Sequence, residues 1–500
     1  MNNMNVLSWL ILVPLLASPV IYIAGRLATR KERLPKAARW LAIAALVGTY
    51  VPLFSAGKAV LNGVPVILKM NAISLQLDAI GLLFSAVVVT LCLLVTIFSI
   101  SYMSGEDKEE KFYSLLLAMS GSMIGLVCAT DLFNLWVWFE AMAVTSYLLV
   151  AFYRKQPAAL EAGVKYLVQS ASGSVLVVIG IALVFMTTGT LDMSLIAGNG
   201  SPEMLALAGA FFIIGFGVKS ALVPMHTWLP DAHSQAPSGI SAMLSGVVIE
   251  AGLIVLLRSL SITWLANVPW GVILMWFAAI NMLVGNLMAL RQKEVKRLLA
   301  YSSVSHMGYI LMGIGFALAY QQLNGAAGSF FHLITHAFGK GLAFLSAGTL
   351  LYTLRLSKHD HSPLLVTDLD GASRRYPITA LAFSIAVFSL GGLPPLGGFM
   401  SKWQIFVAGF ESQNTLAMGM VIFTALNSVL SLGYYAPMVN RMYRHEIGDI
   451  VREGGKTNVW LVLPLVLLSI AIIVMGFWPS LVNWIVSPAA EILMQSFGIG

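Results

Sequence analysis

The fold of this 500-residue chain is decided by residues 205–237, which read LALAGAFFIIGFGVKSALVPMHTWLPDAHSQAP. Leu205 to Val218 is an apolar run, and a helix that spans a membrane needs about 20 largely apolar residues. Lys219 follows that run directly, and Pro224 and Pro230 then interrupt the stretch. This order predicts a membrane helix that holds a charge within the membrane and then breaks.

Apolar runs of the same kind recur from Val6 to Val482. Hydrophobic residues make up 58% of the sequence and charged residues 10%, whereas about a quarter of the residues in a soluble domain are charged. This composition excludes a water-soluble fold. It predicts an all-α, polytopic membrane protein forming a single domain over residues 1–500.

Span length and helix-breaking residues predict about fourteen transmembrane helices. They lie at residues 5–25, 38–57, 76–102, 112–129, 131–152, 160–189, 203–223, 238–260, 265–290, 297–319, 325–354, 377–410, 416–440 and 458–480.

The first apolar segment, Val6 to Ala24, is long enough to span a membrane. We see no small-residue cleavage site following a basic start. We therefore interpret this segment as the first helix and not as a removed signal.

The 29 lysine and arginine residues test the helix count, because positive charge is retained on the cytoplasmic side of a membrane. With fourteen helices, Lys58, Lys69 and Arg258 fall in loops on one side, whereas Lys219, Lys340 and Lys402 fall inside spans. The opposite loops hold the other 23: Arg26, Arg30, Lys31, Arg33, Lys36, Arg39, Lys108, Lys111, Arg154, Lys155, Lys165, Arg291, Lys293, Lys296, Arg297, Arg355, Lys358, Arg374, Arg375, Arg441, Arg444, Arg452 and Lys456. One miscounted helix would invert every later loop, so the asymmetry supports an even number of helices. We expect a multi-pass protein of the cell inner (plasma) membrane with both termini on the outer side.

Five charged residues lie inside the predicted spans: Glu140, Lys219, Glu250, Lys340 and Lys402. An ionised residue at mid-bilayer costs about 2.5–3.5 kcal/mol, so it persists mainly where it faces protein or water. Neither Glu140 nor Lys219 can easily reach the interface by extending its side chain. These positions therefore indicate a polar interior in the bundle.

Histidines accompany the charges. His332, His336 and Lys340 are spaced four apart, so they lie along one stripe of a helix. Lysine suits proton transfer because burial disfavours its charged form, whereas a nearby carboxylate favours it. Static ion pairs are the alternative for any single residue, but so many groups in one domain favour a continuous pathway. We predict a proton relay of Glu140, Lys219, Glu250, His332, His336, Lys340 and Lys402, with His306 as a further candidate.

Two predicted spans are broken beside a lysine. The first break follows Lys219, and the second is GGLPPLGG at residues 391–398, shortly before Lys402. In lipid, the backbone groups freed by a break must find protein or water partners, so broken helices usually line ion sites. Two similar breaks predict an inverted repeat of five-helix units, with half-channels at about residues 112–260 and 265–441.

Other chemistry finds little support in the sequence. The basic residues sit at helix ends and not in a patch interleaved with aromatics, which excludes nucleic-acid binding. Cys92 and Cys128 lie singly in apolar runs, without a haem or iron–sulfur pattern, so we expect no cofactor and no redox chemistry in this chain. His226, Asp231 and His233 flank a break, and we expect no metal there.

Five stretches resemble the antiporter-like subunits shared by respiratory complex I, Mrp multisubunit cation/proton antiporters and membrane-bound hydrogenases. They are DLFNLWVWFE (131–140), VKSALVPMHTWLPDAHSQAP (218–237), KEVKRLLAYSSVSHMG (293–308), HAFGK (336–340) and GLPPLGGFMSK (392–402). The resemblance implies that Glu140 and Lys219 form the coupled pair of one half-channel. It also implies that Lys402 is the terminal site of the other, and that a central connection is made by His332, His336 and Lys340.

One position departs from the family pattern, because Glu250 stands where the family most often has a lysine. A carboxylate there would stabilise the charged form of Lys219 or His306, so the order of proton transfers would differ. Lys402 separates this chain from the complex I subunit of the M type, which has glutamate there. The sequence extends about twenty residues past Pro479, which favours the Mrp D and complex I N types over the longer L type.

The resemblance implies a proton-translocating subunit that works in the lipid bilayer with other membrane subunits, moving protons and, in one version, Na⁺ or K⁺. An Mrp-type Na⁺(K⁺)/H⁺ antiporter subunit driven by an existing gradient is one alternative. A non-transporting structural subunit is another. The sequence leaves open whether the parent complex is an NADH:quinone oxidoreductase type of enzyme, which ion is moved, and in which direction.

Overall fold

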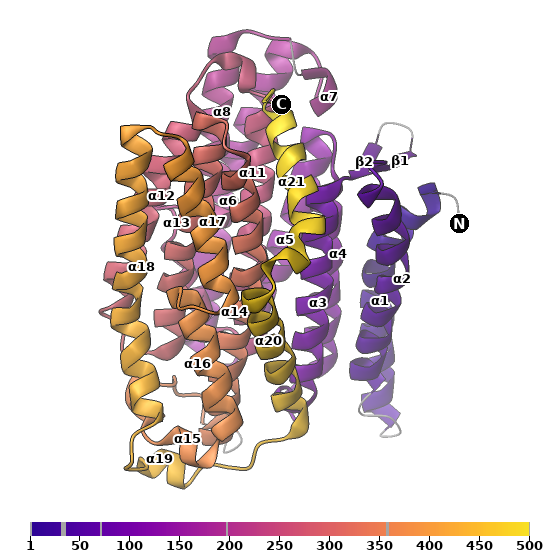
Figure 1. Cartoon of the computed structure of the whole chain (residues 1–500). Helices are drawn as coiled ribbons and strands as arrows, with labels where there is room; N and C mark the ends of the chain where they lie inside the picture. The colour runs from indigo at the N-terminus through magenta and orange to yellow at the C-terminus, as the bar shows by residue number, and fades with distance from the viewer. Residues whose placement is uncertain (1–2, 32–36, 71–72, 197–198, 357–359, 500) are drawn as a thin grey trace.

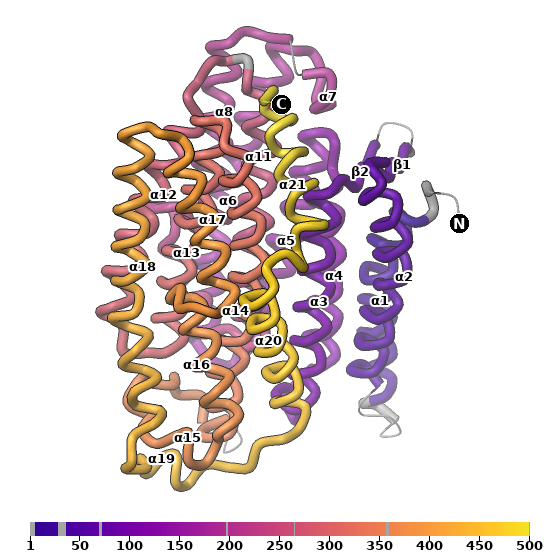
Figure 2. The backbone as a smooth tube through the Cα atoms, in the orientation of Figure 1, coloured from indigo at the N-terminus to yellow at the C-terminus, as the bar shows by residue number. Residues whose placement is uncertain are grey.

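Helices make up nearly all of the computed structural model, which describes residues 3–31, 37–70, 73–196, 199–356 and 360–499. Figures 1 and 2 show long helices packed side by side in one bundle, with short segments at both ends. The helices of the bundle are α1 (Asn3–Lys31), α2 (Ala37–Leu61), α3 (Ala79–Tyr102), α4 (Glu109–Cys128), α5 (Leu132–Val150), α6 (Pro157–Thr188), α8 (Pro202–Lys219), α10 (Ser238–Met243), α11 (Ile249–Ser261), α12 (Trp270–Ala289), α13 (Val295–Tyr320), α14 (Leu323–Leu354), α16 (Pro377–Gly391), α17 (Gly397–Glu411), α18 (Thr415–Met442) and α20 (Val459–Phe477).

Every predicted span therefore coincides with helix. In the described part of the chain, twelve helices are long and apolar enough to cross a membrane, with 238–261 counted as one. The other two predicted spans are special cases. Helix α14 has 32 residues and contains the His332, His336 and Lys340 stripe, and α16 and α17 are two halves of 15 residues each. The all-α, polytopic fold is confirmed.

The centre and the edge of the bundle differ sharply in burial. The most apolar stretches of 238–261 and of α13 are 100% and 94% buried, whereas those of α1 and α6 are 33% and 39% buried. Helix α14 is buried along nearly its whole length. The residues of the predicted relay lie mainly on these inner helices, so the protein and not lipid surrounds them.

Asp78 and Asp131 explain where two helices begin. The carboxylate of Asp78 accepts a hydrogen bond from the Gly81 N–H at 2.8 Å, so α3 starts at Ala79. Asp131 caps α5 in the same way, from the Asn134 N–H at 2.7 Å. Such caps satisfy backbone donors that have no partner inside the helix.

A β-hairpin and a helix after the last predicted span were not predicted. Strand β1 (Val66–Met70) pairs antiparallel with β2 (Ile73–Leu77), where the sequence suggested a loop and the start of a helix. Helix α21 (Asn483–Ser496) follows α20 through a 3₁₀ turn at Pro479–Val482, although Pro488 lies inside it. A five-residue strand is too short to give a clear alternation signal, and an internal proline normally predicts a helix end.

The short elements mark the two ends of the bundle. Figure 1 shows α15 (Ala372–Arg375) and α19 (Asp449–Arg452) at the lower end, and α7 (Met193–Ile196), the hairpin and the end of α21 toward the upper end. Between α8 and α10 lies the short α9 (Trp228–Gln235). A π-helical turn, Leu244–Val248, joins α10 to α11, and such turns often occur at functional sites.

Candidate functional site

Lys219 is the last residue of α8 and is completely buried. Its Nζ donates a hydrogen bond to the Tyr166 hydroxyl at 2.6 Å and lies 3.3 Å from the Ser146 Oγ. It also lies 4.5 Å from the centre of the Tyr166 ring. Ser146 and Tyr166 are themselves 2.9 Å apart. The lysine therefore ends in a small cluster of neutral hydroxyl groups supplied by α5 and α6.

Glu140, on α5, is not joined to Lys219 by an ion pair or hydrogen bond in the described structure. One of its oxygens, Oε1, is buried and has no hydrogen-bond partner among the described residues. The residue before Glu140, Phe139, has its ring centre 5.9 Å from the Lys219 Nζ. The structure thus places the expected pair in one region but not in contact.

The break after α8 is held by neutral side chains. Asn281, from α12, accepts the Val223 N–H at 2.9 Å and donates to the Ala221 carbonyl at 3.2 Å. The Trp228 indole N–H donates to the Val218 carbonyl at 2.8 Å. These bonds satisfy backbone groups that would otherwise be unpaired inside the membrane.

Glu250 and the three histidines form a buried cluster. The Glu250 Oε1 lies 2.7 Å from the His336 Nδ1, and both side chains are fully buried. The His306 Nδ1 lies 3.0 Å from the His332 Nε2, and the His306 and His336 rings are 5.2 Å apart between centres. The cluster joins α11, α13 and α14, and it includes the position at which the sequence departs from the family pattern.

Ser401 and Tyr309 connect this cluster to Lys402. The His332 Nδ1 lies 2.9 Å from the Ser401 Oγ, and Ser401 precedes Lys402 on α17. The Lys402 Nζ lies 4.2 Å from the centre of the Tyr309 ring, which is 5.8 Å from the His332 ring. Lys402 therefore faces the same polar region as the histidines.

The second break is held by the lysine itself. The Lys402 Nζ donates to the Leu390 carbonyl at 2.8 Å and to the Ser428 Oγ at 3.0 Å. Ser428 in turn donates to the Gly391 carbonyl at 3.1 Å. Gly392 adopts a left-handed backbone conformation with φ of 78°, which glycine accepts without strain.

Lys340 occupies a separate branch of the network. Its Nζ donates to the Leu299 carbonyl at 2.9 Å and to the Ser302 hydroxyl. Ser302 also bonds the Tyr435 hydroxyl, and the Tyr435 ring packs edge to face on Tyr434. The Tyr434 hydroxyl continues to Asn286 at 2.9 Å. Lys340 is thus surrounded by hydroxyl and amide groups from α12, α13 and α18.

Several members of this network were missed from the sequence. Tyr166, Tyr309, Ser302, Tyr435 and Asn281 are uncharged residues in apolar runs, and no charge marked them as unusual. Ser302 does lie within the quoted family stretch 293–308, and Tyr309 directly follows it. A search for hydroxyl and amide side chains beside each buried charge would have found them as candidates.

The weaker candidates have structural partners. Asp231 pairs with Arg297 at 2.7 Å and with Lys165 at 3.1 Å. His233 stacks on Phe344 with ring centres 4.7 Å apart, and neither of its ring nitrogens has a partner in the described structure. Within the described residues no group of three or more histidine, cysteine, aspartate or glutamate side chains could hold a metal ion.

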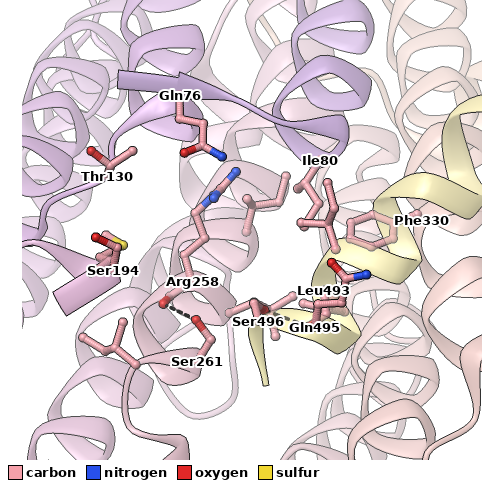
Figure 3. A pocket seen from close by; sticks show the side chains of 15 residues that line it. Gln76, Ile80, Thr130, Ser194, Arg258, Ser261, Phe330, Leu493, Gln495 and Ser496 are labelled. Atoms are coloured by element: carbon pink, nitrogen blue, oxygen red, sulfur yellow. Dashed lines mark hydrogen bonds between the residues drawn. The ribbon is translucent and has the colours of Figure 1, made fainter. Parts of the chain in front are cut away.

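A cavity of about 350 Å³ lies apart from the relay, near the beginning of α3 and the ends of α11 and α21. Figure 3 shows Arg258 extending toward Gln76 in this cavity, with Phe330 and Leu493 on another side. The Arg258 guanidinium forms two hydrogen bonds to the Asp78 carboxylate, at 2.9 and 2.8 Å. The positive charge of Arg258 is therefore compensated by Asp78.

The eight candidate residues all fall within one matched region. A family model described as "NADH:quinone oxidoreductase/Mrp antiporter, TM" matches residues 129–428. The chain belongs to this family. A second model of the same kind, "NADH-Ubiquinone oxidoreductase (complex I), chain 5 N-terminus", matches residues 70–113.

Relatives of this NADH:quinone oxidoreductase/Mrp antiporter family member cover most of its length. The F(420)H(2) dehydrogenase subunit N of Methanosarcina mazei is 32% identical, over 92% of this chain and 93% of that protein. The NADH-quinone oxidoreductase subunit N of Trichlorobacter lovleyi is 29% identical, over 91% of both chains. Hydrogenase-4 component B of Escherichia coli is 30% identical, over 84% of this chain and 63% of that protein.

Solved structures agree with these relatives. A chain of the membrane-bound sulfane sulfur reductase, an archaeal respiratory membrane complex, superposes with a TM-score of 0.85 at 27% identity, covering 99% of both chains. A chain of respiratory complex I from Thermus thermophilus gives 0.75 at 26%, over 94% of this chain and 98% of that one. A chain of the Mrp complex from Dietzia gives 0.85 at 21%, over 99% and 98%, which shows a shared fold.

The family member is therefore an antiporter-like subunit of the complex I, Mrp and hydrogenase type of membrane complex. It is a multi-pass membrane protein, and its neighbours are subunits within multisubunit membrane complexes. Other membrane subunits are accordingly its partners. The expected resemblance to Mrp D and complex I N types is confirmed at the level of the family.

Proposed function

We propose that this subunit moves protons along a buried line that runs from Lys219 through the Glu250–histidine cluster to Lys402. The observation that supports this most strongly is the buried set of contacts from Glu250 to Ser401, which are hydrogen bonds except where the His336 and His306 rings stack with centres 5.2 Å apart. Glu250, His336, His306 and His332 come from three different helices. Packing alone gives no reason for four titratable groups to meet at the centre of an apolar bundle.

The histidine rings suit this role because each can bind a proton at one nitrogen and release one at the other. The His306 Nδ1 to His332 Nε2 contact at 3.0 Å and the His332 Nδ1 to Ser401 contact at 2.9 Å use both nitrogens of His332. A proton taken up at one side of His332 can therefore leave from the other. The position of each hydrogen is set by the network and changes with every transfer.

Water completes the line where side chains do not meet. Lys219 and Glu250 share no direct hydrogen bond in the described structure. Helices α8 and α11 nevertheless pack closely, since a Cβ atom added to Gly252 of α11 would lie 3.0 Å from the Lys219 Cβ. Polar groups too far apart for a direct bond are commonly bridged by ordered water. The carboxylate at Glu250 attracts a proton from Lys219 toward the histidines, which is the role we assign to this departure from the family pattern.

Proton entry is assigned to the end of the bundle that is rich in lysine and arginine. A cavity of about 240 Å³ at that end is lined by Lys296, Ser234 and His361, among others. The Lys296 Nζ donates to the Ser234 carbonyl at 3.1 Å, and the buried His233 is the preceding residue of α9. The two unpartnered nitrogens of His233 offer a step from that cavity to the branch that holds Lys340.

The parent complex and the driving reaction belong to the same proposal. Subunits named N in F(420)H(2) and NADH-quinone oxidoreductases favour a redox-driven complex, in which other chains supply the electron transfer. Antiport of Na⁺ or K⁺ against protons is the second candidate, and a structural subunit without transport is the third. We place both termini on the outer face, because the loops rich in lysine and arginine belong on the cytoplasmic side.

Proton uptake by membrane vesicles that hold the whole complex tests this function. Lys219→Ala and Glu140→Ala should each abolish uptake while leaving assembly of the complex intact, because both remove a charge near the start of the line. Lys58→Ala, which changes an exposed lysine on α2 away from the line, is the matched control and should keep uptake. Undiminished uptake in both variants would exclude the relay, and uptake that needs added Na⁺ or K⁺ would favour antiport.

A further inference from the structure

A groove of about 520 Å³ lies between α1, α4, α5 and α6, away from the relay. Its volume is within the range of about 300–1,000 Å³ that is typical of sites for small molecules. The residues that line it divide into a cationic group, Lys108, Lys111 and Arg154, and an apolar group that includes Leu115, Leu148 and Leu160. We refer to it as the cationic groove.

The three cations belong to the loops with the excess of positive charge. In the described structure the side chains of Lys108, Lys111 and Arg154 have no hydrogen bond or ion pair with other residues of the chain. Asp107 also lines the groove, but its carboxylate pairs with Lys155 at 3.1 Å. Three positive charges at the mouth of the groove therefore lack a counter-charge from the described residues.

The apolar wall faces the surroundings of the bundle. Leu148 and Leu160 are 46% and 44% exposed, so in a membrane they contact lipid chains. Leu115 lies one helical turn beyond Lys111, which places it about 6 Å deeper along α4. The hydroxyl of Ser114, which also lines the groove, lies 2.9 Å from the Ser18 Oγ of α1. The groove thus has a charged mouth at the level of lipid headgroups and an apolar interior below it.

We propose that the cationic groove binds an anionic phospholipid of the cytoplasmic leaflet, with its phosphate at Lys108, Lys111 and Arg154 and an acyl chain along Leu115, Leu148 and Leu160. Tyr22 of α1 lies beside the groove as an interfacial aromatic residue. A lipid seated there contacts both α1 and the α4–α6 helices. It would fill the space between the peripheral first helix and the half of the bundle that holds Lys219.

The charge of the mouth favours an anionic headgroup over a zwitterionic one. Lysine and arginine near a membrane surface attract anionic lipids, and basic pockets between transmembrane helices on the cytoplasmic side are a known form of headgroup site. The guanidinium of Arg154 can also form paired hydrogen bonds with phosphate oxygens. A neighbouring protein subunit would need an acidic segment to match the same mouth, and we treat that occupant as an outcome of the test.

Photo-crosslinking in nanodiscs tests the proposal. The whole complex is reconstituted in phosphatidylcholine with a small fraction of phosphatidylglycerol that has a diazirine in its acyl chain, and labelled peptides are mapped by mass spectrometry. We expect labelling of peptides from residues 107–115 and 148–160. In the Lys108→Gln, Lys111→Gln, Arg154→Gln variant, the affinity of the groove for phosphatidylglycerol relative to phosphatidylcholine should fall on the order of a hundredfold. This is the effect expected from the loss of three surface cations.

Two controls separate this site from general lipid contact. The variant Arg291→Gln, Lys293→Gln, Arg444→Gln removes three cations from the same side of the membrane outside the groove and should label like the native chain. A diazirine phosphatidylcholine should label the groove equally in all three proteins. Equal labelling of the native chain and the groove variant by phosphatidylglycerol, or cross-linking of the groove to an acidic segment of another subunit, would overturn the proposal.

Discussion

The two helix breaks sit beside a buried lysine, but they hold their free carbonyl groups in different ways. At the break after α8, Asn281 and Trp228 satisfy the backbone, and Lys219 is left to bond hydroxyl groups of neighbouring helices. At the break between α16 and α17, Lys402 itself donates to the Leu390 carbonyl. Loss of the Lys219 side chain would therefore leave the bonds at its break in place, whereas loss of the Lys402 side chain would remove the donor to the Leu390 carbonyl.

This difference separates a buried lysine that holds the backbone of its own break from one that bonds only side chains. A lysine that bonds only side-chain hydroxyls exchanges partners readily, because hydroxyl groups both donate and accept. A lysine that bonds a backbone carbonyl keeps a donor there in either protonation state, but its loss leaves the carbonyl unpaired. The variants described next test this distinction, in order of decreasing effect.

The largest effect is expected for Lys402→Ala. It should abolish proton uptake and also destabilise the subunit by about 1–3 kcal/mol, because the Leu390 carbonyl loses its partner in a buried setting. Lys402→Gln retains a donor and should recover stability without recovering uptake. The dissociation temperature of the purified complex and vesicle uptake measure the two effects. If Lys219→Ala lowers that temperature as much as Lys402→Ala, the two breaks do not differ as described.

Glu250→Lys should give the next largest effect. It replaces the partner of His336 with a like charge, so transfer through the histidine cluster should slow strongly. Glu250→Gln keeps the size and a hydrogen bond, and it should give an intermediate rate of uptake. Uptake is again the measurement. An unchanged rate in Glu250→Lys would show that this residue has no special part in the relay.

A smaller effect is expected for Asn281→Ala. The Val223 N–H and the Ala221 carbonyl would both lose their partner, which costs about 1–3 kcal/mol in a buried site. Because Lys219 stays in place, uptake should fall less than in Lys219→Ala. Asn62→Ala, on an exposed turn, serves as the control for dissociation temperature. Complete loss of uptake without loss of stability would mean that Asn281 belongs to the relay.

The smallest effect is expected for Trp228→Phe. This change removes one hydrogen bond, to the Val218 carbonyl, and should cost about 0.5–1.5 kcal/mol. The ring remains stacked on Tyr166, at 3.9 Å between centres. Trp276→Phe, on the exposed side of α12, should leave the dissociation temperature unchanged. A cost as large as that of Asn281→Ala would indicate that the indole holds the break more firmly than a single bond does.

The sequence predicted the main architecture because the membrane imposes simple rules. Apolar length located every span, and the one-sided distribution of lysine and arginine supported their number. The breaks were visible at Pro224 and at residues 391–398, where turn-forming residues interrupt apolar runs. The hairpin at residues 66–77 and helix α21 were missed, because short strands and a proline inside a helix give weak or misleading local signals.

The partners within the site were harder to predict than its charges. Buried lysine, glutamate and histidine stand out in an apolar sequence, but sequence distance does not show that Glu250 meets His336 or that Lys219 meets Tyr166. Those contacts depend on how helices far apart in the chain pack. Helix rotation also explains why Glu140 does not reach Lys219 directly, since a position along a span does not fix the direction of its side chain.

Trp228 has a mechanical consequence for the first break. Its indole N–H holds the carbonyl just before Lys219, and its ring lies flat on the tyrosine that receives the lysine hydrogen bond. The first turn of the same short helix contains the partly exposed Asp231, which pairs with Arg297 and Lys165. A neighbouring subunit that displaced Arg297 or Lys165 would move α9 and, with it, Trp228. Because Trp228 contacts both the backbone before Lys219 and the Tyr166 ring, that movement would change the hydrogen bond between Lys219 and Tyr166 from outside the bundle.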